Sequence, residues 1–249
     1  MNLTVKPFQD NKAELCFVVP VKSPSCAKQR LSDVLDHPQR TALARQLYQH
    51  TLHYLRQHFP KYDVLVVSES QDVLTTSETL GCKTLLQSDD AGLNSAMELA
   101  ASEITRQGYK GMVMLPADLA FLSHDELSRL LQYHKQYDLI LAEANDGGTN
   151  ALLVQPANAI RFRFGLNSAQ AHQREATKAN LKVCVLKLPL MAVDIDKATD
   201  LAIAQQANSN ALAGFGKVPL FPSAKSIPTA KAMPSATEVS QRSGGPCHA

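Results

Sequence analysis

Three aspartates are spaced so that they could bind one metal ion. Asp194 and Asp196 stand two residues apart in a short extended segment, and Asp118 closes the apolar run 111–117. Side chains two residues apart on an extended strand face the same side, so Asp194 and Asp196 can share one ion. Mg²⁺ takes a few carboxylate oxygens and completes its coordination with water and substrate phosphates. The three aspartates therefore predict a Mg²⁺ site for a phosphorylated substrate; the alternative is that each one only caps a strand or starts a turn.

A basic loop follows the first apolar run of the chain. Lys22, Lys28 and Arg30 place three cations within nine residues, directly after residues 15–21. In open α/β sheets, ligands bind beyond the carboxyl ends of the strands, where Asp118 also falls. Cations at this edge would neutralise a triphosphate that a metal ion bridges. The loop has neither the glycines nor the Lys-Ser/Thr pair of a Walker A sequence, and the alternative is a solvated surface loop.

Two other segments offer contacts to a nucleotide. Gly92 lies at the entry to a predicted helix, where glycine permits the close approach of a ligand. Asn94 follows it, and could either contact the ligand or cap the helix. Ser68 and Glu69 end an apolar run and could hydrogen-bond a base edge, although either could equally be a polar strand end.

A second anion site is predicted in residues 146–168. This segment contains a Gly-Gly-Thr turn, the cations Arg161 and Arg163, and Ser168 at the start of a predicted helix. Free backbone N–H groups and the helix dipole at such a position favour an anion. We therefore predict that a second phosphorylated or carboxylated substrate binds here. His172, in the first turn of that helix, is interpreted as a surface histidine rather than as an anion ligand.

Strands and helices alternate along the chain, and this pattern favours an α/β fold with a mainly parallel, mixed sheet flanked by helices. Continuous apolar runs are typical of strands buried on both faces. Strands are predicted at residues 15–21, 63–68, 83–86, 111–115, 138–143, 150–154 and 182–188, and helices at 39–57, 94–106, 123–136, from 169, and at 198–207. The helix at 123–136 opens on Ser-His-Asp-Glu, the pattern of a capping box.

Composition limits the remaining classes of function. The 249 residues suit one domain at 1–212, followed by a Pro/Ser/Ala-rich segment at 213–249 that we predict to be disordered. A net charge of +2 predicts no nucleic-acid partner, and the apolar runs are too short to cross a membrane. The five cysteines, which form no CxxC pair, favour reduced thiols in a cytoplasmic protein rather than a disulfide or zinc framework.

Several short segments, taken together and in order, resemble the 2-phospholactate guanylyltransferases of coenzyme F-420 biosynthesis. They are Val19-Pro-Val-Lys22, Ala27-Lys-Gln-Arg-Leu31, Gly92-Leu-Asn94, Leu115-Pro-Ala-Asp-Leu119, Asp146-Gly-Gly-Thr-Asn-Ala-Leu152, Phe162-Arg-Phe-Gly165 with Ser168, and Val193-Asp-Ile-Asp196. Each segment is short, and the specificity lies in their joint order over residues 15–201. One departure is Ala169, where the family pattern leads us to expect an aromatic residue.

The resemblance implies a single-domain nucleotidyltransferase fold of the GT-A-like, Rossmann-like type. It implies transfer of GMP from GTP to 2-phospholactate, phosphoenolpyruvate or 3-phosphoglycerate, with release of pyrophosphate. It places Mg²⁺ on Asp118, Asp194 and Asp196, and the phospho-acid on Thr149, Gly165 and Ser168. It places the triphosphate against Lys22, Lys28 and Arg30, which with Asp118 would carry catalysis, and the rest of the nucleotide near Gly92 and Asn94.

Other functions remain open on the sequence alone. The first is another nucleotidyltransferase of this fold, which would join CTP or GTP to a sugar phosphate or molybdopterin. The second is a sugar-transferring enzyme with a paired-aspartate metal site. The third is a non-catalytic nucleotide-binding module that regulates a partner. The oligomeric state is open as well, and a homodimer is compatible with the sequence.

Overall fold

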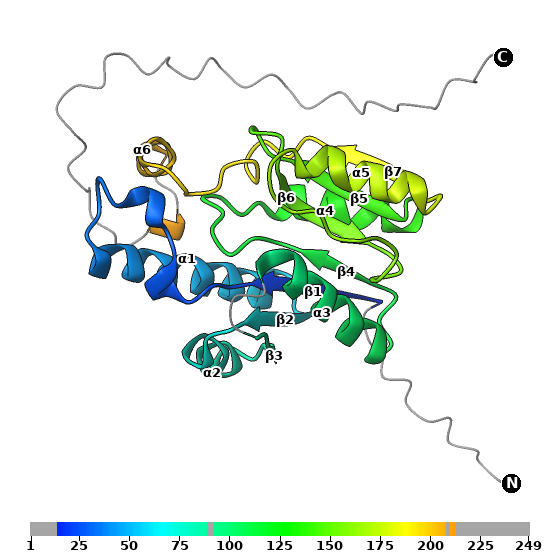
Figure 1. Cartoon of the computed structure of the whole chain (residues 1–249), viewed down its shortest axis with the longest axis horizontal. Coiled ribbons are helices and arrows are strands. Elements are labelled where there is room, and N and C mark those ends of the chain that lie inside the picture. The colour runs from blue at the N-terminus through cyan, green and yellow to red at the C-terminus, as the bar shows by residue number, and fades with distance from the viewer. Residues whose placement is uncertain (1–13, 89–91, 208–209, 213–249) are drawn as a thin grey trace, which may run out of the picture.

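The computed structural model describes residues 14–88, 92–207 and 210–212. The segment 213–249, for which the sequence predicts disorder, lies outside the described residues, and so do Asp89 and Asp90 before the predicted turn at Gly92. Within these limits the chain forms one sheet with helices on both of its faces (Figure 1).

The sheet has seven strands in the order β3-β2-β1-β4-β6-β5-β7. The strands are β1 Leu15–Pro20, β2 Asp63–Ser68, β3 Lys83–Leu86, β4 Gly111–Met114, β5 Leu139–Glu143, β6 Thr149–Val154 and β7 Val183–Leu186. β6 runs antiparallel to its neighbours β4 and β5, and the other pairings are parallel. The predicted mixed, mainly parallel sheet is thus confirmed, and the predicted strand ends agree with the structure to within two residues.

The helices fill the connections between strands. They are α1 His37–His58, α2 Gln71–Thr79, α3 Gly92–Arg106, α4 His124–Gln132, α5 Ser168–Lys178 and α6 Ala198–Gln206, with 3₁₀ turns η1 Pro24–Cys26, η2 Gln29–Leu31, η3 Tyr133–Lys135 and η4 Asn210–Leu212. Helix α2 was not predicted because its sequence is mostly polar and buries only two large apolar side chains, Val73 and Leu74. Among the described helices, none combines the length and apolar character that crossing a bilayer requires.

Alternating side chains of the buried strands reach two separate cores. In β1, Phe17 and Val19 face a cluster that α1, α2 and α4 cover. Cys16 and Val18 face the opposite cluster, which α3 and α5 cover. A strand must be apolar at every position to fill both clusters, since successive side chains point to opposite faces. The continuous apolar runs of the sequence therefore correspond to the central layer of a three-layer structure.

A third apolar cluster, which we call the edge cluster, joins the basic loop, α1, α6 and the aspartate segments. Its buried members are Leu31, Leu35, Leu43, Leu47, Ala120, Ile195, Leu201, Ala204, Ala211 and Leu212. In Figure 1, α6 and the blue loop after β1 lie together at the left of the sheet. Because Leu31 follows the cations of the basic loop and Ile195 separates Asp194 from Asp196, burial of these apolar residues fixes the charged ones beside them.

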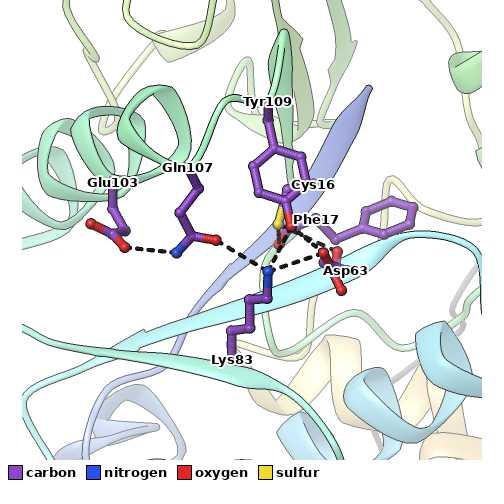
Figure 2. Close-up of polar contacts among 7 residues, drawn as sticks. All are labelled: Cys16, Phe17, Asp63, Lys83, Glu103, Gln107 and Tyr109. Atoms are coloured by element: carbon purple, nitrogen blue, oxygen red, sulfur yellow. Dashed lines mark hydrogen bonds and ion pairs between the residues drawn. The ribbon is translucent and has the colours of Figure 1, made fainter. Parts of the chain in front are cut away.

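A polar network closes the opposite edge of the sheet, at the amino ends of the parallel strands. Lys83 Nζ lies 3.1 Å from Asp63 Oδ2, 3.1 Å from Gln107 Oε1 and 2.8 Å from the Tyr109 hydroxyl (Figure 2). The Tyr109 hydroxyl also donates to Asp63 Oδ2. Burial, and then this hydrogen bond to Asp63, raise the pKa of Tyr109. The network ties β2, β3 and the start of β4 together, far from the carboxyl ends where the aspartates lie.

Gly111 permits the close packing of β4 against β6, and replacing it by alanine should destabilise the fold. An added Cβ would lie 2.6 Å from the Val154 carbonyl oxygen and 2.7 Å from Gln155 Cβ. We expect Gly111→Ala to lower the free energy of unfolding in urea by about 1–3 kcal/mol. Ser102→Ala, on the exposed side of α3, is the control and should change it by less than about 0.5 kcal/mol. Equal stability of both variants would contradict this close packing.

Candidate active site

The predicted site residues collect at the edge of the sheet that is formed by the carboxyl ends of its parallel strands. Lys22 follows the carboxyl end of β1, and Asp118 follows that of β4. β6 is antiparallel to β4, with Met114 opposite Leu152, so the amino end of β6 reaches the same edge. Thr149, the first residue of β6, therefore lies on the same side of the sheet as the cations and the aspartates. This topology puts the two predicted anion sites next to each other.

A short antiparallel pairing brings the aspartates together. Leu119 and Asp194 form an isolated bridge. The Ile195 N–H donates to the Asp118 carbonyl at 3.0 Å, and the Ala120 N–H donates to the Val193 carbonyl at 2.9 Å. These bonds join two segments that lie more than seventy residues apart in sequence. Asp118 is consequently close enough to Asp194 for its charge to raise the pKa of that carboxyl.

The segment that carries Asp194 is held in place from two directions. The Glu126 carboxylate accepts hydrogen bonds from the N–H groups of Leu190, at 3.1 Å, and Met191, at 3.0 Å. Asn150 Nδ2 donates to the Met191 carbonyl at 3.0 Å. The sequence predicted a capping box with Glu126, but only half of it is present: Ser123 caps α4 by accepting from the Glu126 N–H. The Glu126 side chain instead fixes the approach to Asp194.

Two of the three aspartates, Asp118 and Asp196, are each paired with a cation of the basic loop. Lys28 Nζ lies 2.6 Å from Asp118 Oδ2, and the Lys28 side chain is only 6% exposed. Arg30 Nη1 lies 2.6 Å from Asp196 Oδ2, with the arginine 70% exposed. Lys28 has a left-handed backbone (φ 57°) at the position just before η2. Lys22 is exposed directly after β1.

The aspartates have the chemistry of a Mg²⁺ site but are not gathered into a three-ligand cage. Over the described ranges, no group of three or more His, Cys, Asp or Glu side chains is placed to hold a metal ion. Asp118 and Asp196 are instead paired with Lys28 and Arg30. Burial, and then the nearby Asp118, raise the pKa of Asp194. An all-oxygen donor set with such a carboxyl fits a hard divalent cation, and the Mg²⁺ assignment stays a prediction.

The three residues assigned to the phospho-acid converge around the start of α5. Ser168 is buried, and its hydroxyl donates to Thr149 Oγ1 at 3.0 Å. The Ser168 N–H donates to the Gly165 carbonyl at 3.2 Å. Gly165 has a φ of +132°, a backbone conformation that residues other than glycine rarely adopt. Residues 161–165, which we call the acceptor loop, thus close onto Thr149 and Ser168.

Asn94 connects α3 to the acceptor loop. Its Oδ1 accepts from the Phe164 N–H at 2.7 Å, and its Nδ2 donates to the Phe164 carbonyl at 3.2 Å. Asn94 lies inside α3, which begins at Gly92, so it is not the helix cap that the sequence left as an alternative. Gly92 has a φ of +75°, and among the described residues no group beyond its own helix and chain neighbours lies within 4 Å of where its Cβ would be. The nucleotide-binding roles assigned to Gly92 and Asn94 stay predictions.

The interpretation of His172 as a surface residue is wrong. Its side chain is fully buried, and its ring packs edge-on against Phe164 with centroids 4.6 Å apart. Burial lowers its pKa to about 4, against an opposing effect of Glu175. The sequence did contain a signal for this position: Ala169, His172 and Ala176 have the i, i+3, i+7 spacing of one helix face, and all three are buried.

Ser68 and Glu69 have structural partners at the end of β2, and Glu69 stays partly exposed. Glu69 Oε1 accepts from the Ser23 N–H at 2.7 Å. Ser68 is fully buried and its Oγ accepts from the Ser70 N–H at 3.1 Å, so it is not exposed to a nucleotide. As for the cysteines, Cys26 is an exposed free thiol, and Cys82 and Cys184 are buried free thiols.

Comparison with known protein families gives a match over most of the chain. A family model described as guanylyl transferase, CofC-like, matches residues 15–206. The 3-phospho-D-glycerate guanylyltransferase of Colwellia psychrerythraea is 37% identical, over 75% of this chain and 89% of that protein. The phosphoenolpyruvate guanylyltransferase of Rubrobacter xylanophilus is 35% identical, over 74% and 90%. The 2-phospho-L-lactate guanylyltransferase of Methanothermobacter thermautotrophicus is 32% identical, over 75% and 82%.

Solved structures share the fold at much lower sequence identity. A provisionally named nucleotide-diphospho-sugar transferase from Desulfovibrio desulfuricans superposes with a TM-score of 0.62 at 20% identity, over 80% of this chain and 89% of the other. A 4-diphosphocytidyl-2C-methyl-D-erythritol synthase superposes with a TM-score of 0.53 at 11% identity, over 77% and 98%. These likenesses establish a nucleotidyltransferase-type α/β fold, as the sequence predicted.

The buried His172 should make the protein less stable in mild acid. Its pKa is 6.5 without burial and about 4 in the folded chain, so between these values the unfolded chain binds a proton that the folded chain excludes. Stability therefore falls as the pH drops below 6.5, and His172 accounts for a loss of about 2 kcal/mol by pH 5. Urea unfolding of wild type and His172→Gln at pH 7 and pH 5 measures this difference. Parallel losses in the two proteins would contradict it.

Proposed function

This chain belongs to the CofC-like guanylyl transferase family, and we propose that it transfers GMP from GTP to the phosphate of a small phospho-acid, releasing pyrophosphate. The structural observation that supports this most directly is the common sheet edge. Asp118, just after β4, pairs there with Lys28 of the basic loop, and Thr149, at the start of the neighbouring strand β6, bonds Ser168 of α5. One reaction centre can therefore bring a nucleotide and a second anion together.

The acceptor is proposed to be a phosphorylated three-carbon acid. The three relatives named above act, by their names, on 3-phospho-D-glycerate, phosphoenolpyruvate and 2-phospho-L-lactate. All three acids carry a phosphate and a carboxylate. The acceptor loop carries Arg161 and Arg163, both exposed, which supply positive charge for a dianionic ligand. 3-Phospho-D-glycerate is the first acceptor to test, and the place in F-420 biosynthesis that the resemblance implies depends on which acid is used.

The proposed step is an in-line transfer of the GMP group. A phosphate oxygen of the acceptor attacks the α-phosphorus of GTP, a new P–O bond forms, and the bond to the β-phosphate oxygen breaks as pyrophosphate leaves. The attacking oxygen is already anionic, so no general base is needed, and catalysis consists of alignment and charge neutralisation. Lys22, Lys28 and Arg30 would neutralise the triphosphate. Mg²⁺ bound by Asp118, Asp194 and Asp196 would supply further neutralisation of the phosphates.

Pyrophosphate release is the direct test of this function. Purified protein with Mg²⁺ and GTP should release pyrophosphate only when one of the three acids is added, and 3-phospho-D-glycerate is tested alongside phosphoenolpyruvate and 2-phospholactate. Removing Mg²⁺ with a chelator should stop the release, and adding it back should restore it. No release with any of the three acids, from protein that binds GTP, would refute the proposed acceptor class.

Asp118 should be essential because it is paired with the buried Lys28 and lies beside Asp194. We expect Asp118→Asn to lower kcat by about 100-fold or more while the protein remains folded. Asp125→Asn is the matched control: this aspartate on α4 is fully exposed and should be replaceable without loss of kcat. Steady-state pyrophosphate release and thermal unfolding of both variants make the comparison. Near-normal turnover of Asp118→Asn would remove it from the catalytic machinery.

A further inference from the structure

We propose that His172 is a positioning residue that fixes the Thr149 hydroxyl as a hydrogen-bond donor toward the phosphate of the acceptor. This inference rests on the proposed function and concerns the acceptor side of the same site. Its basis is a chain of hydrogen bonds that runs from the acceptor loop through the buried imidazole to Thr149.

The hydrogen bonds determine which ring nitrogen carries the proton. His172 Nε2 accepts from the Arg163 backbone N–H at 3.0 Å, so this nitrogen has no proton of its own. A neutral imidazole then carries its one proton on Nδ1. Burial favours the neutral ring. Nδ1 lies 3.2 Å from Thr149 Oγ1, and the Nδ1–H therefore donates to the threonine oxygen.

The Thr149 oxygen accepts a second hydrogen bond from Ser168. The Ser168 hydroxyl donates to Thr149 Oγ1 at 3.0 Å. A hydroxyl has two acceptor positions and one proton to donate, so with both acceptor positions filled Thr149 can only donate to a further group. Thr149 is 7% exposed at the amino end of β6, where its proton can reach the site. A phosphate oxygen, which accepts hydrogen bonds, matches this donor.

The same imidazole also fixes the acceptor loop. The ring accepts from the Arg163 N–H and packs edge-on against Phe164, the next residue. Asn94 makes two further hydrogen bonds to the Phe164 backbone. The charged groups next to the ring are Glu175, on the same helix, and Arg163, whose Nε lies 3.7 Å from Glu175 Oε1. His172 thus sets both the direction of the Thr149 proton and the position of the loop that ends in Gly165.

Two substitutions separate the two hydrogen bonds of the imidazole, the one to Thr149 and the one to the Arg163 N–H. The amide nitrogen of asparagine lies near the position of Nδ1, so His172→Asn keeps a donor to Thr149 and loses the acceptor for Arg163. The amide of glutamine lies near Nε2, so His172→Gln keeps the acceptor and loses the donor. We expect His172→Gln to raise KM for the phospho-acid by at least about tenfold, His172→Asn to raise it by no more than about threefold, and KM for GTP to stay within about twofold in both. The reverse order, or an equal rise in KM for GTP, would overturn the proposal.

A double-mutant cycle tests whether His172 acts through Thr149. Thr149→Val removes the hydroxyl and should itself raise KM for the acid. If the role of His172 is to orient that hydroxyl, adding His172→Gln to Thr149→Val should raise KM by no more than about twofold further. Independent, multiplying effects would mean that the histidine only supports the fold, and would overturn the proposal.

Controls separate failure of this inference from failure of the proposed function. His50→Gln, which removes a half-buried histidine of lowered pKa on α1, should leave both KM values unchanged. Wild type must first release pyrophosphate with one of the acids; if it does not, the proposed function fails. If wild type is active and His172→Gln has an unchanged KM for the acid, this inference alone fails. Should His172→Gln not fold, His172→Asn decides: a tenfold rise in its KM for the acid overturns the proposal.

Discussion

The geometry of the candidate site depends on one short antiparallel pairing outside the main sheet. Two backbone hydrogen bonds, between the segments around Leu119 and Asp194, join the end of β4 to the chain that returns from β7. Neither segment is long enough to be stable as a strand by itself. The pairing persists because Ala120 and Ile195 are buried in the edge cluster, while Glu126 and Asn150 hold the approach to it. Apolar burial thus places acidic groups that would otherwise repel one another.

Charge balance at this edge explains why a lysine is buried there. A charged lysine whose side chain is 6% exposed would be unfavourable alone, and Asp118 offsets that cost at 2.6 Å. Burial, and then the charge of Asp118, raise the pKa of Asp194, so the three groups are interdependent. A phosphate or a divalent cation entering this edge would change the balance for all of them. The site has the features expected where strongly charged ligands bind and leave.

Much of this fold was predictable because its signals are local. The strands were found from continuous apolar runs, and the common location of Lys22 and Asp118 follows from the rule that ligands bind at the carboxyl edge of such sheets, whereas Thr149 reaches this edge because β6 is antiparallel. What was missed depends on contacts between distant segments. Helix α2 has a polar sequence, the Glu126 carboxylate bonds residues more than sixty positions away, and the burial of His172 is decided by the sheet beneath α5. The spacing of Ala169, His172 and Ala176 indicates a buried helix face, but no short segment names the partners that these residues contact.

The reversed direction of β6 divides the site into two parts of separate origin. The cations and Asp118 stand at the ends of parallel strands, whereas Thr149 opens the antiparallel strand and is completed by the acceptor loop and α5. The three relatives share a guanylyltransferase name and differ in the acid that each name gives. The architecture is therefore modular: the residues proposed to meet the acceptor come from one strand, one loop and one helix, and those proposed to meet the nucleotide come mainly from the parallel half.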